Sequence, residues 1–497
     1  MRILYAASEV APFAKTGGLA DVAGALPSAL ARLGHDVKVI MPKYGSLKGK
    51  AQGITKRDDL SLRLADQVYQ FTLDSVNLSE AKVEVLFLGN DRFFDRPGLY
   101  QENGKDYPDN LERFAAFSRA VLEVPGLLDW HPDLIHYNDW QTALIPAYLN
   151  AYFASNPEYR RIGTLFTIHN LGYQGLFLPE GFSGLGLTNE YFTPETLEFY
   201  GKVNLLKAGL IFGGVINTVS PTYSSEIQTP EFGCGLEGVL QARRDNLFGI
   251  INGVDYDRWD PAHDSHIKFP YDSLHLQGKR LCKAALQKEC NLSETDAPLI
   301  GMITRLTPQK GVDLVIKIID ELMRLDLQMV ILGDGDPDIC RELGQAMKRY
   351  PKRLSVRLAF DDGLAHRIEA GSDIFLMPSR YEPCGLNQLY SLRYGTVPIV
   401  RKTGGLVDTV IDATPSNIAS NKATGFIFEQ ASAHELLNTV RLAVKLYQEK
   451  DIWRQLIRAG MKADFSWDKS AKEYEKLYLL AIKKAAGLPS PPVEQTL

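Results

Sequence analysis

Residues 299–325, LIGMITRLTPQKGVDLVIKIIDELMRL, decide the fold class. The stretch begins with a continuous apolar run, LIGMIT, which lacks polar alternation and therefore predicts a strand that is buried on both faces. After a loop, apolar side chains recur at helical spacing, at Leu314, Val315, Ile318, Ile319 and Leu322. A buried strand that leads through a loop into an amphipathic helix is the repeating unit of a parallel α/β sheet.

The same unit recurs along the chain in two consecutive sets of about six strands. The apolar runs of the first set are 2–7, 36–42, 83–89, 134–139, 164–170 and 215–220, and those of the second set are 299–304, 328–335, 355–360, 373–379, 397–402 and 425–428. We therefore predict an α/β protein with two Rossmann-like, doubly wound parallel-sheet domains that face a cleft, 1–253 and 254–460. A helix at 461–486 is expected to pack back on the first domain, and the Pro-rich tail 487–497 to be disordered.

Composition excludes several classes of protein. The length of 497 residues predicts two or three domains, and the net charge of -5 argues against nucleic acid as a partner. No run of 18 apolar residues exists, so no membrane partner is expected. The five cysteines contain no C-x-x-C pair, which disfavours a disulfide framework or a structural zinc site and favours a reducing compartment. We predict a cytoplasmic protein.

Two loops of nearly identical sequence occur, one in each half of the chain. KTGGLADV covers 15–22 and KTGGLVDTV covers 402–410. Paired glycines allow the backbone to approach a ligand closely, and a helix N-terminus offers free N–H groups to anions. A single loop of this kind can be a plain connection. Two of them, each beside a lysine, favour an anionic ligand that is held in the cleft.

Other strand ends carry groups that fit the same ligand. Arg305 and Lys310 lie between a strand and a helix, where two cations suit a diphosphate, although both can also be solvated loop cations. Glu382 in PSRYEPCGL can accept hydrogen bonds from sugar hydroxyls, or it can be a surface acid. FTIHN and NDW place His169, Asn170 and Asp139 at two further strand ends. A lone histidine is more often structural, but the strand-end position favours function.

Several other motifs fail on their context. GCGLEG at 233–238 has the spacing of a dinucleotide fingerprint, but no strand precedes it. The alternating acids of 334–338 lack the glycine and glutamate of a calcium loop, and the D-x-D of 255–257 fits a turn better than a metal site. The chain also has no G-K-[ST], no G-x-S-x-G and no H-E-x-x-H. No metal and no cofactor are expected.

Taken together, these motifs resemble the bacterial glycogen synthase and starch synthase family, retaining glucosyltransferases of the GT-B fold that use ADP-glucose. The resemblance covers essentially the whole chain, from KTGGLADV through NDW, FTIHN, INGVD and TRLTPQKGVDL to EPCGLNQLYSLRYG and KTGGLVDTV. It implies ADP-glucose and an α-1,4-glucan (glycogen, starch or maltooligosaccharide) as substrates. It also implies a cytoplasmic enzyme that can associate with glucan particles.

The resemblance implies roles for individual residues. It assigns catalysis to Glu382, His169, Lys15, Arg305 and Lys310. Substrate contacts are implied for Gly18, Asp21, Asp139, Asn170, Asn252, Phe360, Cys384, Gly385, Leu386, Thr403 and Gly404. Within this set, Arg305 and Lys310 would hold the ADP phosphates, and Glu382 would hold the glucosyl 3-hydroxyl. The His169 carbonyl would face the anomeric carbon, and Phe360 would stack on adenine.

Two positions depart from related sequences. Many relatives read NDWH where this chain has Gln141, and the wider GT-B class often has a second glutamate where this chain has Tyr390. Glu382 therefore has no carboxylate partner on that helix. Since no acid is expected beneath the anomeric carbon, we expect retention by front-face departure of ADP rather than by double displacement.

Rival functions come from other classes. A non-catalytic glucan-binding protein with the same fold would be expected to have lost the cations and the acid named above. A phosphorylase would need a pyridoxal Schiff-base lysine, for which the sequence shows no pattern. A nucleotide-sugar epimerase is disfavoured by the glucan-family motifs. We expect a glucosyltransferase.

Overall fold

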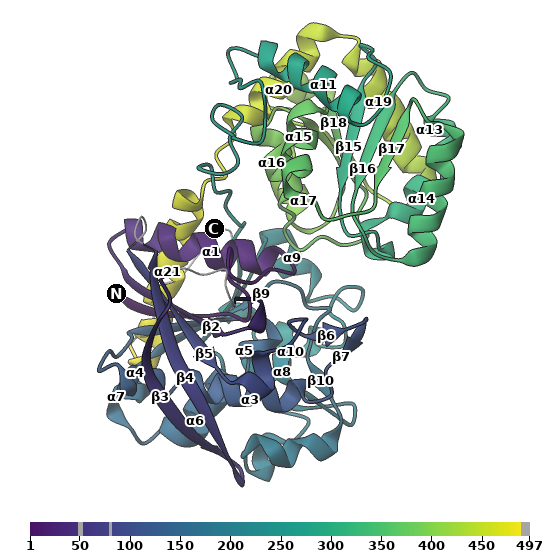
Figure 1. Cartoon of the computed structure of the whole chain (residues 1–497). Coiled ribbons are helices and arrows are strands. Elements are labelled where there is room, and N and C mark those ends of the chain that lie inside the picture. The colour runs from purple at the N-terminus through teal and green to yellow at the C-terminus, as the bar shows by residue number, and fades with distance from the viewer. Residues whose placement is uncertain (48–52, 79–81, 489–497) are drawn as a thin grey trace. The chain divides into compact units, whose positions relative to one another are not determined.

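The computed structural model describes residues 1–47, 53–78 and 82–488 (Figure 1). They form two compact units. Unit 1 comprises Met1–Gly253 and the segment from Trp467 onward, and unit 2 comprises Val254–Ser466. The expected boundary at 460 lies inside helix α20 (Lys450–Lys462), and the chain leaves unit 2 only after Ser466. Most of the predicted tail, from residue 489 on, lies outside the described residues.

A nine-stranded sheet forms the centre of unit 1. Its strands, in spatial order, are β14 (Leu247–Gly249), β13 (Val215–Thr218), β9 (Gly163–Ile168), β8 (Leu134–Asn138), β1 (Arg2–Ala6), β2 (Asp36–Pro42), β5 (Val83–Gly89), β4 (Gln67–Leu78) and β3 (Thr55–Leu64). The strands from β14 to β5 are parallel, and β3 and β4 continue the sheet as an antiparallel pair. Strand order reverses between β1 and β8, as in a doubly wound fold.

Unit 1 also contains eleven α-helices and two small sheets within the described residues. The helices are α1 (Gly18–Arg32), α2 (Asp91–Phe94), α3 (Asn110–Val121), α4 (Val124–Leu127), α5 (Asp139–Thr142), α6 (Ile145–Phe153), α7 (Pro157–Arg160), α8 (Leu205–Phe212), α9 (Pro221–Glu226), α10 (Glu237–Ala242) and α21 (Trp467–Ala485). The small sheets are β6 (Gln101–Glu102) with β7 (Lys105–Asp106), and β10 (Leu176–Phe177), β12 (Lys202–Asn204) and β11 (Glu198–Phe199).

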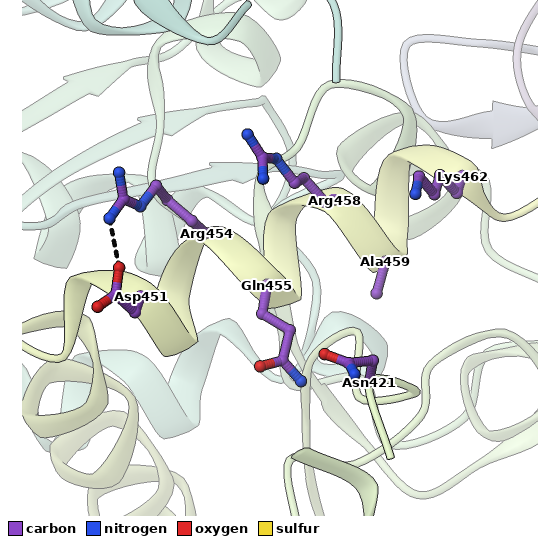
Figure 2. A pocket seen from close by; sticks show the side chains of 7 residues that line it. All are labelled: Asn421, Asp451, Arg454, Gln455, Arg458, Ala459 and Lys462. Atoms are coloured by element: carbon purple, nitrogen blue, oxygen red, sulfur yellow. Dashed lines mark hydrogen bonds and ion pairs between the residues drawn. The ribbon is translucent and has the colours of Figure 1, made fainter. Parts of the chain in front are cut away.

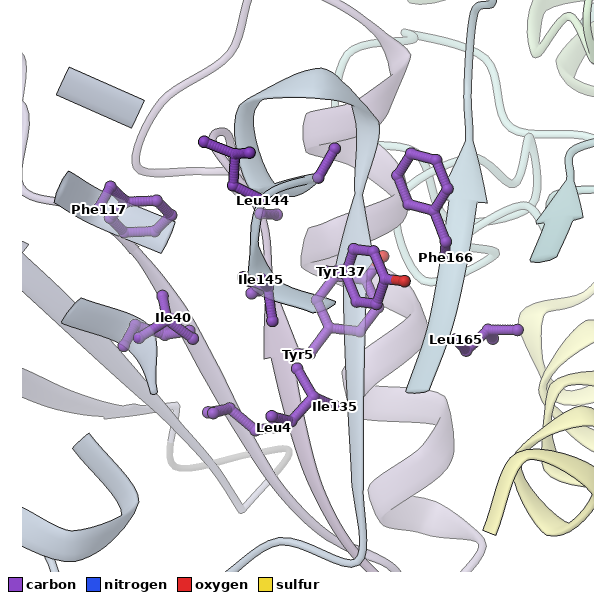
Figure 3. Packing of buried hydrophobic residues seen from close by; sticks show 14 of the residues in the cluster. Leu4, Tyr5, Ile40, Phe117, Ile135, Tyr137, Leu144, Ile145, Leu165 and Phe166 are labelled. Atoms are coloured by element: carbon purple, nitrogen blue, oxygen red, sulfur yellow. The ribbon is translucent and has the colours of Figure 1, made fainter. Parts of the chain in front are cut away.

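Apolar side chains from both faces of the central strands build the core of unit 1. Figure 3 shows Leu4 and Tyr5 of β1 beside Ile135 and Tyr137 of β8, and Leu165 and Phe166 of β9 lie on the next strand. The Tyr137 and Phe166 rings stack with centroids 5.1 Å apart. Every residue of β5, β8 and β9 is buried, which is the pattern expected of strands covered on both faces.

The C-terminal helix α21 packs on α1 and β9 of unit 1, as predicted (Figure 1). Its contact with the sheet is partly polar. The Tyr478 hydroxyl lies 2.8 Å from His136 Nδ1, and Asn217 Nδ2 donates to the Tyr474 hydroxyl at 3.2 Å. Both tyrosines are fully buried, so these hydrogen bonds fix the helix in one register against the strands.

Unit 2 contains a six-stranded, fully parallel sheet. Its spatial order is β17 (Leu354–Arg357), β16 (Gln328–Leu332), β15 (Leu299–Ile303), β18 (Ile374–Met377), β19 (Val397–Arg401) and β20 (Phe426–Phe428). Numbered along the chain, this is the order 3-2-1-4-5-6 of the Rossmann fold, with its reversal between β15 and β18. The fold class predicted from sequence is therefore confirmed.

The helices of unit 2 flank this sheet. They are α11 (Gln277–Glu289), α12 (Val312–Lys317), α13 (Ile319–Leu322), α14 (Pro337–Arg349), α15 (Asp362–Gly371), α16 (Asn387–Arg393), α17 (Gly404–Thr409), α18 (Pro415–Ala419), α19 (Ala433–Tyr447) and α20. The single helix predicted after the first strand is two segments, because Ile318 leaves helical geometry at φ -115° and ψ 12°. Among the described residues of the whole chain, no helix is both long enough and apolar enough to cross a membrane.

Candidate active site

The strand-order reversal in unit 2 brings two of the predicted loops together. The loop after β15 carries Arg305 and Lys310, and the loop after β18 carries Ser379 and Glu382. Because β15 and β18 are adjacent and parallel, both loops leave the same edge of the sheet. In open α/β sheets, ligands bind at this reversal, beyond the carboxyl ends of the strands.

Lys310 and Glu382 form a close ion pair at this edge. Lys310 Nζ lies 2.8 Å from Oε1 and 2.6 Å from Oε2 of Glu382, and the Ser379 hydroxyl donates to Oε2 at 2.9 Å. The Glu382 side chain is buried and that of Lys310 is half-buried. A buried carboxylate is stable only with such partners, so the pair holds both groups in fixed positions.

Further contacts lock the two loops to each other. Arg380 donates to both carboxylate oxygens of Asp313 at 2.6 and 2.8 Å, and Asn387 Nδ2 donates to the Ile303 carbonyl at 2.6 Å. Gly311 has a φ of +68°, and a Cβ atom there would lie 2.0 Å from the Pro378 carbonyl oxygen. Only glycine allows this approach, which explains why a glycine directly follows Lys310.

The second K-T-G-G loop joins the same cluster. Gly404 adopts a φ of +44°, and a Cβ atom there would lie 2.0 Å from the Glu382 carbonyl oxygen. The Gly405 N–H donates to the carbonyls of Glu382 and Pro383 at 3.2 and 3.1 Å. Cys384 and Thr403 are buried next to these contacts. The structure thus brings three of the predicted loops of unit 2 into one site.

The remaining predicted residues of unit 2 lie nearer the solvent. Arg305 is exposed at the end of β15, and Gly385 and Leu386 are half-buried before α16. Gly385 has a φ of +73°, which favours glycine. The Phe360 side chain follows β17 and is 84% exposed, so its ring can stack on a planar group from solution.

In unit 1 the reversal between β1 and β8 gathers a second group of predicted residues. Asp139 directly follows β8 and adopts a φ of +53°, which is unusual for a residue with a side chain. Its Oδ1 accepts the backbone N–H of His169 at 2.7 Å. Burial raises the pKa of Asp139 to about 7, although the backbone N–H groups of His169 and Asn170 act in the opposite direction. Asp139 thereby fixes the backbone of the loop after β9.

His169 is held in one tautomer by its neighbour Asn138. The Asn138 amide nitrogen donates to the Ala6 carbonyl at 3.0 Å, so its Oδ1 is the acceptor for His169 Nε2 at 2.9 Å. Nε2 therefore carries the proton, as assigned from this hydrogen-bond network. Desolvation lowers the pKa of His169 to about 3, and the ring is neutral near pH 7. A neutral imidazole of this kind is a poor general acid, although its N–H still donates a hydrogen bond.

The first K-T-G-G loop rests on a further candidate residue, Glu9, which the sequence motifs do not include. Lys15 Nζ pairs with Asp21 Oδ1 at 2.6 Å, close to Gly18 at the start of α1. Beneath the loop, the buried carboxylate of Glu9 accepts the Thr16 hydroxyl at 2.6 Å and the Tyr100 hydroxyl at 2.7 Å. Glu9 follows β1 as Asp139 follows β8, so the same strand-end rule would have found it.

The structure also places Gln141 and Tyr390, the two positions that differ from related sequences, and the predicted substrate residues Asn252 and Asn170. Gln141 is buried in α5, and its Oε1 has no hydrogen-bond partner within the described residues. Tyr390 stacks on Trp259 with ring centroids 3.9 Å apart, so an aromatic residue has a packing role at the position where the wider GT-B class was expected to have a second glutamate. Asn252 is buried, and its Oδ1 also lacks a partner among the described residues, whereas Asn170 Oδ1 accepts the Gly172 N–H at 3.0 Å.

One further cavity lies away from these loops. Figure 2 shows a hollow of about 440 Å³ along α20, and it is lined by Asn421, Asp451, Arg454, Gln455, Arg458, Ala459 and Lys462. None of the predicted site residues lines it.

The acidic stretch 334–338, which lacks the residues of a calcium loop, has a structural role instead. Asp336 caps α14 by accepting the backbone N–H groups of Asp338 and Ile339.

Two family models match the chain. A model described as the starch synthase catalytic domain matches residues 2–242, and a model described as glycosyl transferases group 1 matches residues 285–459. Two Rossmann-like sheets with polar loops at both strand-order reversals fit these matches. Fold and site define a glycosyltransferase of the GT-B class.

The most similar relatives define the family. A glycogen synthase of Syntrophotalea carbinolica is 48% identical over 97% of this chain and 99% of its own length, and glycogen synthase 1 of Methylococcus capsulatus is 47% identical over 97% of each chain. The solved catalytic domain of starch synthase IV from Arabidopsis thaliana, bound to ADP and acarbose, is 35% identical with a TM-score of 0.90 over 97% of this chain and 99% of that chain. The chain belongs to the glycogen synthase and starch synthase family of glucosyltransferases. The predicted enzyme class is confirmed, and a non-catalytic glucan-binding protein has no support.

Proposed function

We propose that this enzyme transfers the glucosyl group of ADP-glucose to the 4-hydroxyl at the non-reducing end of an α-1,4-glucan, with retention of configuration. The observation that carries the proposal is the Lys310–Glu382 pair at the strand-order reversal of unit 2, in a chain 35% identical to a starch synthase domain bound to ADP and acarbose. A cytoplasmic location goes with this proposal, since the part of the chain that the structure describes holds no disulfide between its five cysteines.

The donor would be held mainly by charge. Arg305 and Lys310 are proposed to bind the diphosphate, and Lys15 to contact the diphosphate or the glucan. Glu382 would accept the glucosyl 3-hydroxyl while Ser379 keeps its carboxylate oriented. In this proposal the lysine and arginine side chains supply the countercharge for the leaving group, and no bound metal is required. Cations fixed in advance around a developing charge are the largest single source of rate enhancement in many enzymes.

The transfer step balances without a protein nucleophile. The bond between the anomeric carbon and the phosphate oxygen breaks, and ADP leaves with the electron pair. The acceptor 4-oxygen forms the new bond on the same face, and its proton passes to the departing phosphate. Asp139 is not proposed as a nucleophile, because its Oδ1 already accepts the His169 N–H at 2.7 Å. Asp139 is instead a positioning residue for the His169 carbonyl.

Nucleotide release tests the proposal directly. ADP and UDP release are measured from ADP-glucose and UDP-glucose, with and without glycogen or maltooligosaccharide. We expect ADP release that depends on glucan, and its absence would refute the proposed function. Under saturating glucan, Glu382→Ala and Lys310→Ala should each lower turnover by ~10²–10³-fold. Arg341→Ala, which removes an exposed cation of unit 2 paired with Asp338, is the matched control and should leave turnover unchanged.

A further inference from the structure

Three side chains of unit 2 that play no part in the proposed transfer lie close together. His266, Asp362 and His366 each offer one donor atom, and these atoms lie within 4.8 Å of one another. Asp362 and His366 are four residues apart at the start of α15, so they share one face of that helix. His266 comes from the segment before α11, and its Nδ1 lies 3.5 Å from the position that a Cβ atom of Gly363 would take.

His366 is arranged as a metal ligand usually is. Its Nδ1 lies 2.8 Å from Asp264 Oδ2, and the same oxygen accepts the Tyr394 hydroxyl at 2.6 Å. A carboxylate that accepts a hydroxyl proton also accepts the imidazole proton, so Nδ1 carries the hydrogen and Nε2 keeps its lone pair. The His366 side chain is 0% exposed, and Nε2 has no hydrogen-bond partner among the described residues. Buried nitrogen atoms without a partner are rare.

We propose that Nε2 of His366, together with His266 and Asp362, binds a first-row divalent cation of the Zn²⁺ type. The hydrogen bond from His366 to Asp264 reproduces the carboxylate–histidine–metal arrangement that fixes the tautomer of a ligating imidazole. Two imidazoles and one carboxylate form a ligand set that suits zinc and its neighbours, with a fourth position left for water.

Neighbouring side chains show what competes with a cation for Asp362 and what a bound cation would hold together. Arg258 lies 2.6 Å from Asp362 Oδ2, so the cation must share the carboxylate with a guanidinium. The His366 ring stacks on Trp259 with centroids 3.7 Å apart, and Trp259 also stacks on Tyr390 of α16. A bound cation would therefore fasten the first segment of unit 2 to α15 and stabilise the stack. The role is structural, and it does not depend on the proposed glucosyl transfer.

Equilibrium binding of Co²⁺ to the full-length, chelator-treated protein tests the site. We expect one Co²⁺ per chain with an absorption spectrum that lacks thiolate charge-transfer bands, since no cysteine belongs to the cluster. His266→Ala and Asp362→Asn change side chains that are not fully buried, and each should weaken binding at least tenfold. The control His275→Ala removes an exposed histidine that also sits beside a carboxylate, Asp272, and should bind as the wild type does. Unchanged affinity in both cluster variants, thiolate bands, or no Co²⁺ binding would each overturn the proposal.

Tryptophan fluorescence provides a second readout. Because Trp259 stacks directly on His366, we expect Co²⁺ to quench part of the emission in the wild type and in His275→Ala, but not in Trp259→Phe. The Trp259→Phe variant should still bind one Co²⁺. Quenching that persists in Trp259→Phe would place the cation elsewhere and overturn the assignment.

Discussion

The carboxylate of Glu9 accepts two hydrogen bonds from Thr16, one from its hydroxyl at 2.6 Å and one from its backbone N–H at 2.5 Å. Glu9 is buried, and Tyr100 donates to the same carboxylate at 2.7 Å. The exposed Lys15 and Gly17 flank Thr16 in the chain. The loop that exposes Lys15 and Gly17 is therefore anchored from beneath by one buried acid.

Replacing Glu9 should reduce activity through the loop rather than through chemistry. Glu9→Ala leaves the Thr16 and Tyr100 donors without an acceptor, and displacement of the loop by about 1 Å can cost ~10²-fold in rate. Glu9→Gln keeps the side-chain volume and one acceptor oxygen but replaces the other accepting oxygen by an NH2 donor, so its loss should be smaller than that of Glu9→Ala without being absent. Initial rates of glucan-dependent ADP release measure both variants. Equal rates for wild type and Glu9→Ala would show that the anchor has no functional effect.

Removing both members of the Lys310–Glu382 pair should restore stability that is lost in Lys310→Ala, but it should not restore activity. Lys310→Ala leaves a buried carboxylate without its cation, which costs ~3–5 kcal/mol of unfolding free energy for a fully buried pair and less here because Lys310 is half-buried. The double variant Lys310→Ala with Glu382→Ala removes both charges and should recover much of that stability. Its activity should stay as low as that of the single variants. Urea unfolding and turnover, measured on the same samples, test this difference, and a double variant as unstable as Lys310→Ala would contradict it.

Strand positions were predictable because the chain marks buried strands clearly. All twelve apolar runs correspond to parallel strands, and runs such as 36–42 and 83–89 match β2 and β5 residue for residue. Continuous apolar runs do not mark the antiparallel pair β3 and β4, because its apolar residues alternate with polar ones, as at Leu60, Leu62 and Leu64. A search for continuous runs cannot find a strand that is buried on one face only.

Because the strands can be located from the sequence, the candidate residues at their ends can be predicted as well. The side chains that contact these residues cannot. Strand ends pointed to Lys310, Glu382 and Asp139, and the structure gives each of them a specific contact. Ser379 and Asn138 were overlooked, since a small polar residue at a strand end has no distinctive spacing. Their importance arises only from tertiary contacts, such as the hydrogen bond from Ser379 to Glu382.

Gly404 should tolerate no side chain. A Cβ atom there would meet the Glu382 carbonyl oxygen at 2.0 Å, and the φ of +44° disfavours residues other than glycine. Gly404→Ala must displace the backbone at Glu382, so we expect a loss of ~10²-fold in turnover, as for other small misplacements of catalytic groups. Gly344→Ala is the control, because a Cβ atom within α14 would contact nothing within 4 Å. Turnover and thermal unfolding compare the two variants, and similar results for both would refute the packing argument.

His169 should not titrate during catalysis. Desolvation lowers its pKa to about 3, so the ring stays neutral from pH 5 upward. His169→Ala should lower turnover if His169 makes the proposed contacts to the transferred glucose, yet the shape of the pH–rate profile between about pH 5 and 9 should match that of the wild type. A limb near pH 6–7 that is present in the wild type and missing in His169→Ala would show that the imidazole acts as a general acid or base.

Asp139 should make unit 1 less stable as the pH rises. Burial raises its pKa to about 7 in the folded chain, against ~3.9 in the unfolded chain. Between these two values the folded state binds more protons than the unfolded state, so the free energy of unfolding falls from about pH 4 to pH 7 and levels off above. Asp139→Asn keeps an acceptor for the His169 N–H and cannot ionise, so it should lose this contribution to the pH dependence. Compared with the wild type, Asp139→Asn should gain stability at pH 8 relative to pH 4. Urea unfolding of both proteins at pH 4, 6 and 8 measures the difference, and parallel curves would mean that Asp139 ionises at its ordinary pKa in the fold.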